Sequence, residues 1–291
     1  MSVYKHSYRA YSGRVTPLWT RVWVIARYGL MEVWSSKITI TLFTLSVLPF
    51  LAFLIFIYLA NDPMAMKLIG SGNLEGLEIG PAFFLKVLES QCWIALILAS
   101  WMAPRLISFD LADNSLPILL SHPISRFGYV FGKFIALFAS LSVVTWIPGL
   151  LLFTYQSYSS PVPWAAKNFS VAVGMLAGAL IWTVLLSLLA LALSSWVKWR
   201  IVATGIIFAG VLMPAGVGGI IGSIMRSKWG LLLNLPVMMT ELWQRLLGAP
   251  EAFPADLFLP TFSIVASLLL ACLLFAAMLN ARIRAREVVR G

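Results

Sequence analysis

The sequence has 291 residues, of which 60% are hydrophobic and only 11% are charged, and its net charge is +10. A soluble domain carries about 25% charged residues, so this chain has too little charge to cover a soluble globule. Disorder is excluded because 18 Phe, 12 Trp and 8 Tyr supply much apolar surface. The basic balance is typical of the cytoplasmic loops of membrane proteins. We therefore expect an all-α integral membrane protein, a single transmembrane domain over 1–291, with no nucleic-acid partner and no metal site.

The first predicted element is an interfacial helix over 17–37, begun by a proline. On a helical wheel its large apolar side chains fall on one stripe, whereas Arg21 and Glu32 lie opposite. Tryptophans on one face and arginines elsewhere are typical of an amphipathic helix at the headgroup level. The alternative is that the stripe packs on the bundle. The residues predicted to contact the membrane interface are Trp19, Trp23, Leu30 and Trp34.

Six membrane-spanning helices are predicted after it. A span needs about 20 largely apolar residues, and five uncharged stretches have that length. A sixth stretch, 90–104, spans only when it is extended back to Ala82, with Lys86 and Glu89 near the headgroups or paired. The expected spans are 38–60, 82–105, 127–157, 168–196, 201–224 and 257–280.

The basic residues decide the number of spans. With six spans and both termini in the cytoplasm, 15 of the 21 Lys and Arg lie inside. Without the second span the count becomes 10 inside and 11 outside, which removes the usual excess of basic residues on the cytoplasmic side. The charges therefore favour six spans, with 106–126 as a cytoplasmic loop.

The outer segment 226–256 precedes the last span. It is apolar but interrupted by Pro236, Pro250 and Pro254, so we expect short re-entrant or interfacial helices there. Two glycine pairs in the fourth and fifth spans have the GxxxG spacing that lets helices approach closely, and both packing within one subunit and a dimer interface remain open for them: Gly174 with Gly178, and Gly218 with Gly222.

The cytoplasmic loop 106–126 contains candidate helix caps at 110–115 and Pro117, which predict a short helix ending near Leu120. A loop that only connected two spans would not need the leucines of this helix in the cytosol. They therefore indicate a docking surface for another protein, and the alternative is that they bury in the bundle.

The chain shows no chemistry that could supply its own energy. No ionisable residue lies in the central part of a predicted span, so no relay for an ion gradient is visible. The glycines of 128–133 resemble a phosphate-binding loop, but they are separated by three residues and Phe134 stands where Ser or Thr is needed. Energy is therefore expected from elsewhere, unless the protein needs none.

The loop also carries a family resemblance. Asp110 is followed by NSLPILLSHPISR at 114–126 and by YVFGK at 129–133. This pattern resembles the permease subunits of ABC type-2 transporters, which have an acidic residue, a Gly-Thr pair, Leu-x-x-Leu-Leu, Pro-Val/Ile-Ser-Arg and a Gly-Lys entering the third span. Here Asn114-Ser115 replaces the Gly-Thr pair and Pro117 is added. The order of interfacial helix, six spans, loop and re-entrant segment is similar over the whole chain.

The resemblance implies the permease subunit of an ATP-driven, exporter-type complex in a bacterial-type plasma membrane. It implies a second permease copy or homologous permease, membrane lipids, ABC ATPase subunits that bind ATP and Mg, and either transport or force transmission to an extracytoplasmic partner. The leucines would fill an ATPase groove, Pro123 would fix a hinge and Arg126 would pair with an acidic group or phospholipid. The alternatives are a non-transporting anchor or regulatory subunit and an intramembrane hydrolase. The implied ATPase-coupling residues are Asp110, Asp113, Ser115, Leu116, Leu119, Leu120, Pro123, Ser125 and Arg126.

Overall fold

The computed structural model describes residues 17–62, 79–112, 125–160, 163–225, 227–249 and 259–282, and all regular elements within them are helical. Six helical segments are long and apolar enough to cross a membrane, with α6 and α7 forming the third of them together. The predicted all-α fold with six membrane-spanning helices is thus confirmed. The elements in chain order are α1 (Leu18–Trp34), α2 (Lys37–Asn61), α4 (Pro81–Ala112), α6 (Arg126–Ser142), α7 (Trp146–Ser159), α8 (Trp164–Lys167), α9 (Phe169–Trp196), α10 (Arg200–Met225), the 3-10 helix η2 (Lys228–Leu233), α11 (Leu235–Leu247) and α12 (Thr261–Arg282).

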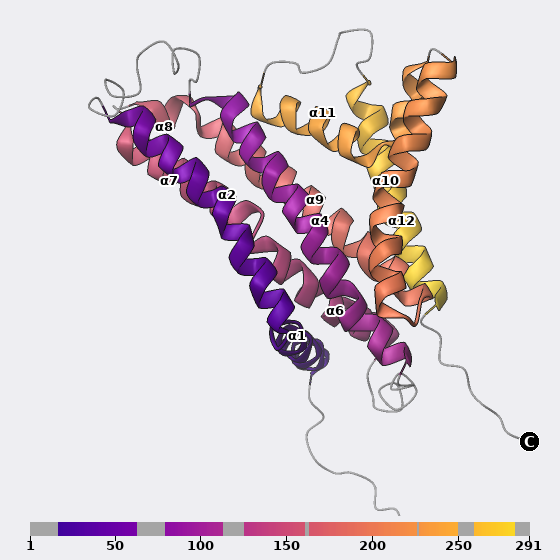
Figure 1. Cartoon of the computed structure of the whole chain (residues 1–291). Coiled ribbons are helices and arrows are strands. Elements are labelled where there is room, and N and C mark those ends of the chain that lie inside the picture. Colours follow the sequence, from indigo (N-terminus) through magenta and orange to yellow (C-terminus); the bar gives the residue numbers. More distant parts are fainter. Residues whose placement is uncertain are drawn as a thin grey trace, which may run out of the picture.

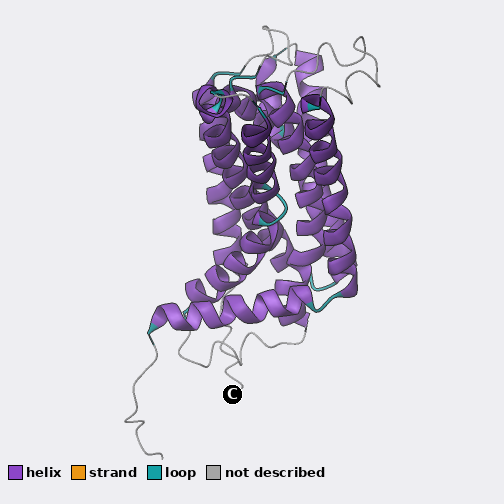
Figure 2. Cartoon of the chain, turned by 90° about the vertical axis from the view of Figure 1, so that its left-hand side faces the viewer, coloured by secondary structure: helices purple, strands orange, loops and turns teal. Residues whose placement is uncertain are grey.

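The long helices run between two ends of the bundle, which we call the α1 end and the α11 end (Figure 1). Figure 2 shows α1 lying across its end of the bundle rather than along it. At the same end the Ser108 hydroxyl of α4 donates to the Ser194 carbonyl of α9, at 3.0 Å. Arg282, the last residue of α12, donates to the neighbouring Ser195 carbonyl. The last turns of α4, α9 and α12 therefore lie together at the α1 end.

The core lies between α4 and α9. In each of these helices 61% of the most apolar 18-residue stretch is buried. The corresponding share is 11% in α2, 22% in α10 and 17% in α12. Trp182 of α9 donates its indole N–H to the Cys92 carbonyl of α4, at 3.2 Å, which adds a polar contact to this packing. The outer faces of α2, α10 and α12 consequently remain available to lipid or to other subunits.

The third span is interrupted between α6 and α7. Pro148 lies in the first turn of α7, where its ring would clash with the carbonyl four residues earlier in a continuous helix. A break inside a membrane leaves polar backbone groups that need partners. The Thr145 hydroxyl bonds to the Leu141 carbonyl at 3.0 Å and lies 3.2 Å from the Thr183 hydroxyl of α9. The Thr145 hydroxyl therefore ties the break to α9 within the bundle.

The predicted short helices before the last span are η2 and α11. Both pack directly against GxxxG glycines of the same chain. A Cβ added to Gly174 would collide with the Leu246 carbonyl of α11, and one added to Gly178 would lie 2.5 Å from the Trp243 ring. The Trp243 indole donates to the Gly178 carbonyl at 3.1 Å. On α10, Gly218 has the same close relation to the Gly230 backbone of η2. Both glycine pairs therefore serve packing within one subunit.

Candidate functional site

The residues that bracket the loop after the second span are the candidate functional site. Asp110 lies in the last turn of α4, and Ser125 caps α6, its hydroxyl accepting from the Gly128 N–H at 3.0 Å. Arg126 is the first residue of α6 and is exposed. The remaining predicted coupling residues lie outside the described residues: Asp113, Ser115, Leu116, Leu119, Leu120 and Pro123. Their contact with an ATPase stays a prediction.

The structure joins the two ends of this loop through a cluster of charges, which we call the Lys133 cluster: Glu32, Asp110, Tyr129 and Lys133. The Lys133 Nζ atom of α6 lies 2.9 Å from the Asp110 Oδ2 atom of α4 and 3.5 Å from the Glu32 Oε2 atom of α1. The Tyr129 hydroxyl donates to the same Asp110 oxygen at 2.6 Å. Three helices that are separate in the sequence are thereby linked at one ammonium group.

The Lys133 cluster differs from a surface ion pair because two of its side chains are buried. The side chain of Lys133 is 8% exposed, and Tyr129 is fully buried. An ionised lysine in such a place is tolerated only when it is paired, because burial removes its hydration. Lys133 meets this need with two carboxylates, and its Nζ atom also lies 5.8 Å from the centre of the Tyr129 ring.

Glu32 is the most exposed charged member of the Lys133 cluster. Burial raises the pKa of its carboxyl above the usual 4.5, and the nearby Asp110 charge acts in the same direction. Lys133 opposes the rise most strongly and Arg105 opposes it weakly. The cluster therefore contains one carboxyl that is protonated more easily than an ordinary surface glutamate.

Two glycines allow α1 to pack closely against α6 next to the Lys133 cluster. A Cβ on Gly132 would lie 2.7 Å from the Ile25 side chain of α1, and a Cβ on Gly29 would lie 3.0 Å from that of Ala136. The glycine pattern at 128–133, which resembles a phosphate-binding loop, therefore lets the two helices approach closely. This close contact brings Glu32 within reach of Lys133.

The predicted membrane-contacting stripe of α1 is only partly covered. Trp19 and Trp23 are 75% and 61% exposed, whereas Leu30 is half-buried against the core. Trp34 packs on the ring of Phe43, with centroids 4.5 Å apart. The buried face of α1 consists of other residues, Ile25, Ala26, Gly29 and Val33. Trp19 and Trp23 are therefore accessible to lipid, and their contact with the membrane stays a prediction.

Sequence reasoning named Asp110 but missed its partners. Lys133 is the one charged residue within 127–157, and the sequence places it in the family pattern and on the cytoplasmic side without indicating a partner. A lone cation in an apolar stretch is itself a sign of a paired functional or structural group. That signal indicates that Lys133 needs a partner, but it does not identify Glu32 and Asp110 as the partners.

The comparisons with known proteins agree with this layout. The sequence pattern of one family, described as ABC-2 family transporter protein, matches residues 82–284. No curated protein shows a significant match to the chain. The matched region begins at the start of the second span and includes the loop, the glycine pairs and the short helices before the last span.

Proposed function

The chain belongs to the ABC-2 family of transporter proteins, and from this premise we propose that it is the permease subunit of an ATP-driven complex. In this complex it forms a path across the membrane with a second permease. Separate ATPase subunits bind ATP and Mg and grip the loop that follows α4. The family assignment makes the chain a membrane transport component rather than a catalyst, and the ATPase activity belongs to a partner.

The orientation that supports this proposal has the α1 end in the cytoplasm of a bacterial-type plasma membrane. That end carries α1, both boundaries of the loop and the last residue of α12. The excess of basic residues in the same segments favours the cytoplasmic side. The α11 end then faces outward, and both chain termini lie inside.

The observation that carries the proposal is the Lys133 cluster. A force on the predicted cytoplasmic loop reaches Asp110 in the last turn of α4 and Arg126 at the start of α6. Asp110 is bonded to Tyr129 and Lys133 on α6, and Lys133 is bonded to Glu32 on α1. A push on the loop by a closing ATPase would therefore move α4, α6 and α1 together. In this mechanism Leu116, Leu119 and Leu120 fill a groove in the ATPase, and Pro123 fixes the angle of the loop.

The first experiment tests the docking surface. The full chain carrying Leu119→Asp with Leu120→Asp is purified from its native membrane together with its bound proteins. We expect the ATPase subunit to be lost from this preparation and to remain with the unchanged chain. Retention of both the ATPase and its ATP-dependent activity in the double variant would contradict the docking proposal. A native complex that contains no ATPase at all would instead support the anchor or regulatory alternative.

The second experiment tests force transmission separately from docking. Lys133→Met removes the ammonium group that links the three helices, and Lys86→Met removes an exposed lysine of α4 as a control. We expect Lys133→Met to retain the ATPase but to lose its coupling to transport, while Lys86→Met keeps both. Equal coupling in the two variants would contradict the role of the Lys133 cluster.

A further inference from the structure

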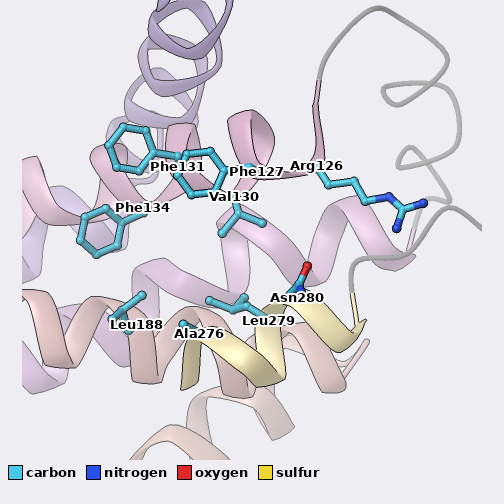
Figure 3. A pocket seen from close by; sticks show the side chains of 9 residues that line it. All are labelled: Arg126, Phe127, Val130, Phe131, Phe134, Leu188, Ala276, Leu279 and Asn280. Atoms are coloured by element: carbon cyan, nitrogen blue, oxygen red, sulfur yellow. The ribbon is translucent and has the colours of Figure 1, made fainter. Parts of the chain in front are cut away.

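A cavity of about 330 Å³ lies between α6, α9 and α12 at the α1 end (Figure 3). Its walls are apolar and include the rings of Phe131 and Phe134 and the side chains of Leu188 and Leu279. Figure 3 shows Arg126 and Asn280 on the same side of the cavity, with the Arg126 side chain extending away from the rings of Phe131 and Phe134. The site is therefore amphipathic along its length, with a cation at one end and hydrocarbon beyond it.

The apolar wall is built by a regular row of phenylalanines on α6. The ring centres of Phe127 and Phe131 are 5.5 Å apart, and those of Phe131 and Phe134 are 6.2 Å apart, in both cases with the ring planes 11° from parallel. Phe134 stacks in the same way on Phe138, at 5.8 Å. The opposite face of α6 carries Lys133 and is buried. Phe127 is exposed and the other three rings are half-buried, so part of the row is free to contact another molecule in the membrane.

The size and charge of the cavity indicate the occupant. A volume of this order is typical of a small-molecule site rather than a protein interface. Among the residues that the structure describes, none that lines the cavity is acidic, and Arg126 has no ion pair. Arg126 begins the third span, so its guanidinium lies at the level of the lipid headgroups.

We propose that this cavity binds an anionic phospholipid, with its phosphate on Arg126 and one acyl chain along Phe131 and Phe134. Arginine matches a phosphate through two parallel N–H donors, and Asn280 supplies a further polar group on the same side of the cavity. The methylenes of the chain cover the faces of Phe131 and Phe134 that the protein leaves half-buried. The proposal needs only the membrane setting of the six spans and is independent of the ATPase partner.

The test uses the purified full chain, with binding of phosphatidylglycerol and phosphatidylcholine measured by native mass spectrometry. Wild type should retain phosphatidylglycerol more tightly than phosphatidylcholine. Arg126→Gln should lower the affinity for phosphatidylglycerol about fivefold, the effect expected of one arginine at a membrane surface. The affinity for phosphatidylcholine should not change. Lys198→Gln is the matched control, because Lys198 is an exposed basic residue at the same end, outside the cavity.

A second variant tests the hydrocarbon part of the site. Ala276→Trp places a large ring in the cavity and should lower the affinity for both lipids equally, provided that circular dichroism shows the helices intact. If this variant fails to fold, a photoreactive benzoylphenylalanine at Phe131 replaces it and should crosslink to lipid. Equal loss in Arg126→Gln and Lys198→Gln would overturn the proposal. So would a crosslink to another protein, to a second copy of the chain or to another segment of the same chain.

Discussion

The two ends of the bundle each carry a helix that does not span the membrane, but they hold it by different means. At the α1 end, α1 is tied to α4 and α6 through the buried ammonium group of Lys133. At the α11 end, α11 lies directly on the backbone of α9 at Gly174 and Gly178. Charged contacts across helices can be broken by movement or protonation. A close contact between two helix backbones leaves no room for a side chain, so any added atom separates the helices.

The charges at the α11 end support this distinction. Glu241 is 1% exposed, but its ion-pair partner Arg245 lies one turn later on the same helix, at 3.3 Å. The pair also reaches the chain that enters α12, since Glu241 accepts from the Leu259 N–H and Arg245 donates to the Thr261 hydroxyl. These contacts hold the residues at the start of α12 against α11. The Lys133 cluster instead joins three helices around a loop.

The largest effect is expected for Lys133→Met. Asp110 and Glu32 would then face each other without their shared cation. We expect a loss of about 3 kcal/mol in the free energy of unfolding, near the lower bound for breaking a buried ion pair because both carboxylates retain some exposure. Unfolding with dodecyl sulfate in mixed micelles measures this loss, with Lys86→Met as the control. Equal stability of the two variants would show that the cluster is not an energetic link.

The next effect is expected at the other end, for Gly174→Ala. The added methyl group would collide with the Leu246 carbonyl, which cannot move without α11. Overpacking of this kind costs about 1–3 kcal/mol. Gly216→Ala on α10 is the matched control, because a Cβ there meets nothing within 4 Å. The same micelle assay compares the two, and a Gly174→Ala protein as stable as the control would contradict the close contact.

A smaller effect is expected for Tyr129→Phe. This change removes one donor to Asp110, which keeps its contact with Lys133. The loss should be about 1 kcal/mol, the usual net value of one hydrogen bond. Tyr158→Phe is a suitable control, because Tyr158 is 90% exposed. If Tyr129→Phe were as damaging as Lys133→Met, the hydrogen bond and not the ion pair would hold the cluster.

The smallest effect is expected for Glu32→Gln, and it should depend on pH. Because the pKa of Glu32 is raised above 4.5 in the folded protein, the folded state binds this proton more tightly than the unfolded state. The contribution of Glu32 to stability therefore improves as the pH falls through the folded pKa toward the unfolded one. Wild type should gain stability relative to Glu32→Gln as the pH falls toward 4.5, with a difference of about 1 kcal/mol or less.

The measurement is the pH dependence of the midpoint of thermal unfolding for both proteins. Lys133, Asp110 and Arg105 face Glu32, so the difference between the two curves reports Glu32 together with its coupling to these groups. Parallel curves, or a gain for wild type at higher pH, would contradict the raised pKa.

The sequence by itself determined the membrane class, the number of spans and the short helices before the last span. These features follow from the length of apolar stretches and the positions of charges and prolines, because a backbone in hydrocarbon must satisfy its own hydrogen bonds. The sequence also placed Asp110 and Arg126 near the two ends of the segment that joins the second and third spans.

Only the tertiary structure decided how these residues are used. Periodicity places Lys133 on one face of α6, but only the packing of α1, α4 and α6 brings Glu32 and Asp110 to its ammonium group. In the same way, the GxxxG spacing of Gly174 and Gly178 allows a close partner, and only the fold shows that this partner is α11 of the same chain. Local pattern specifies what each helix can bury, whereas the contacts between distant helices depend on how all of them pack at once.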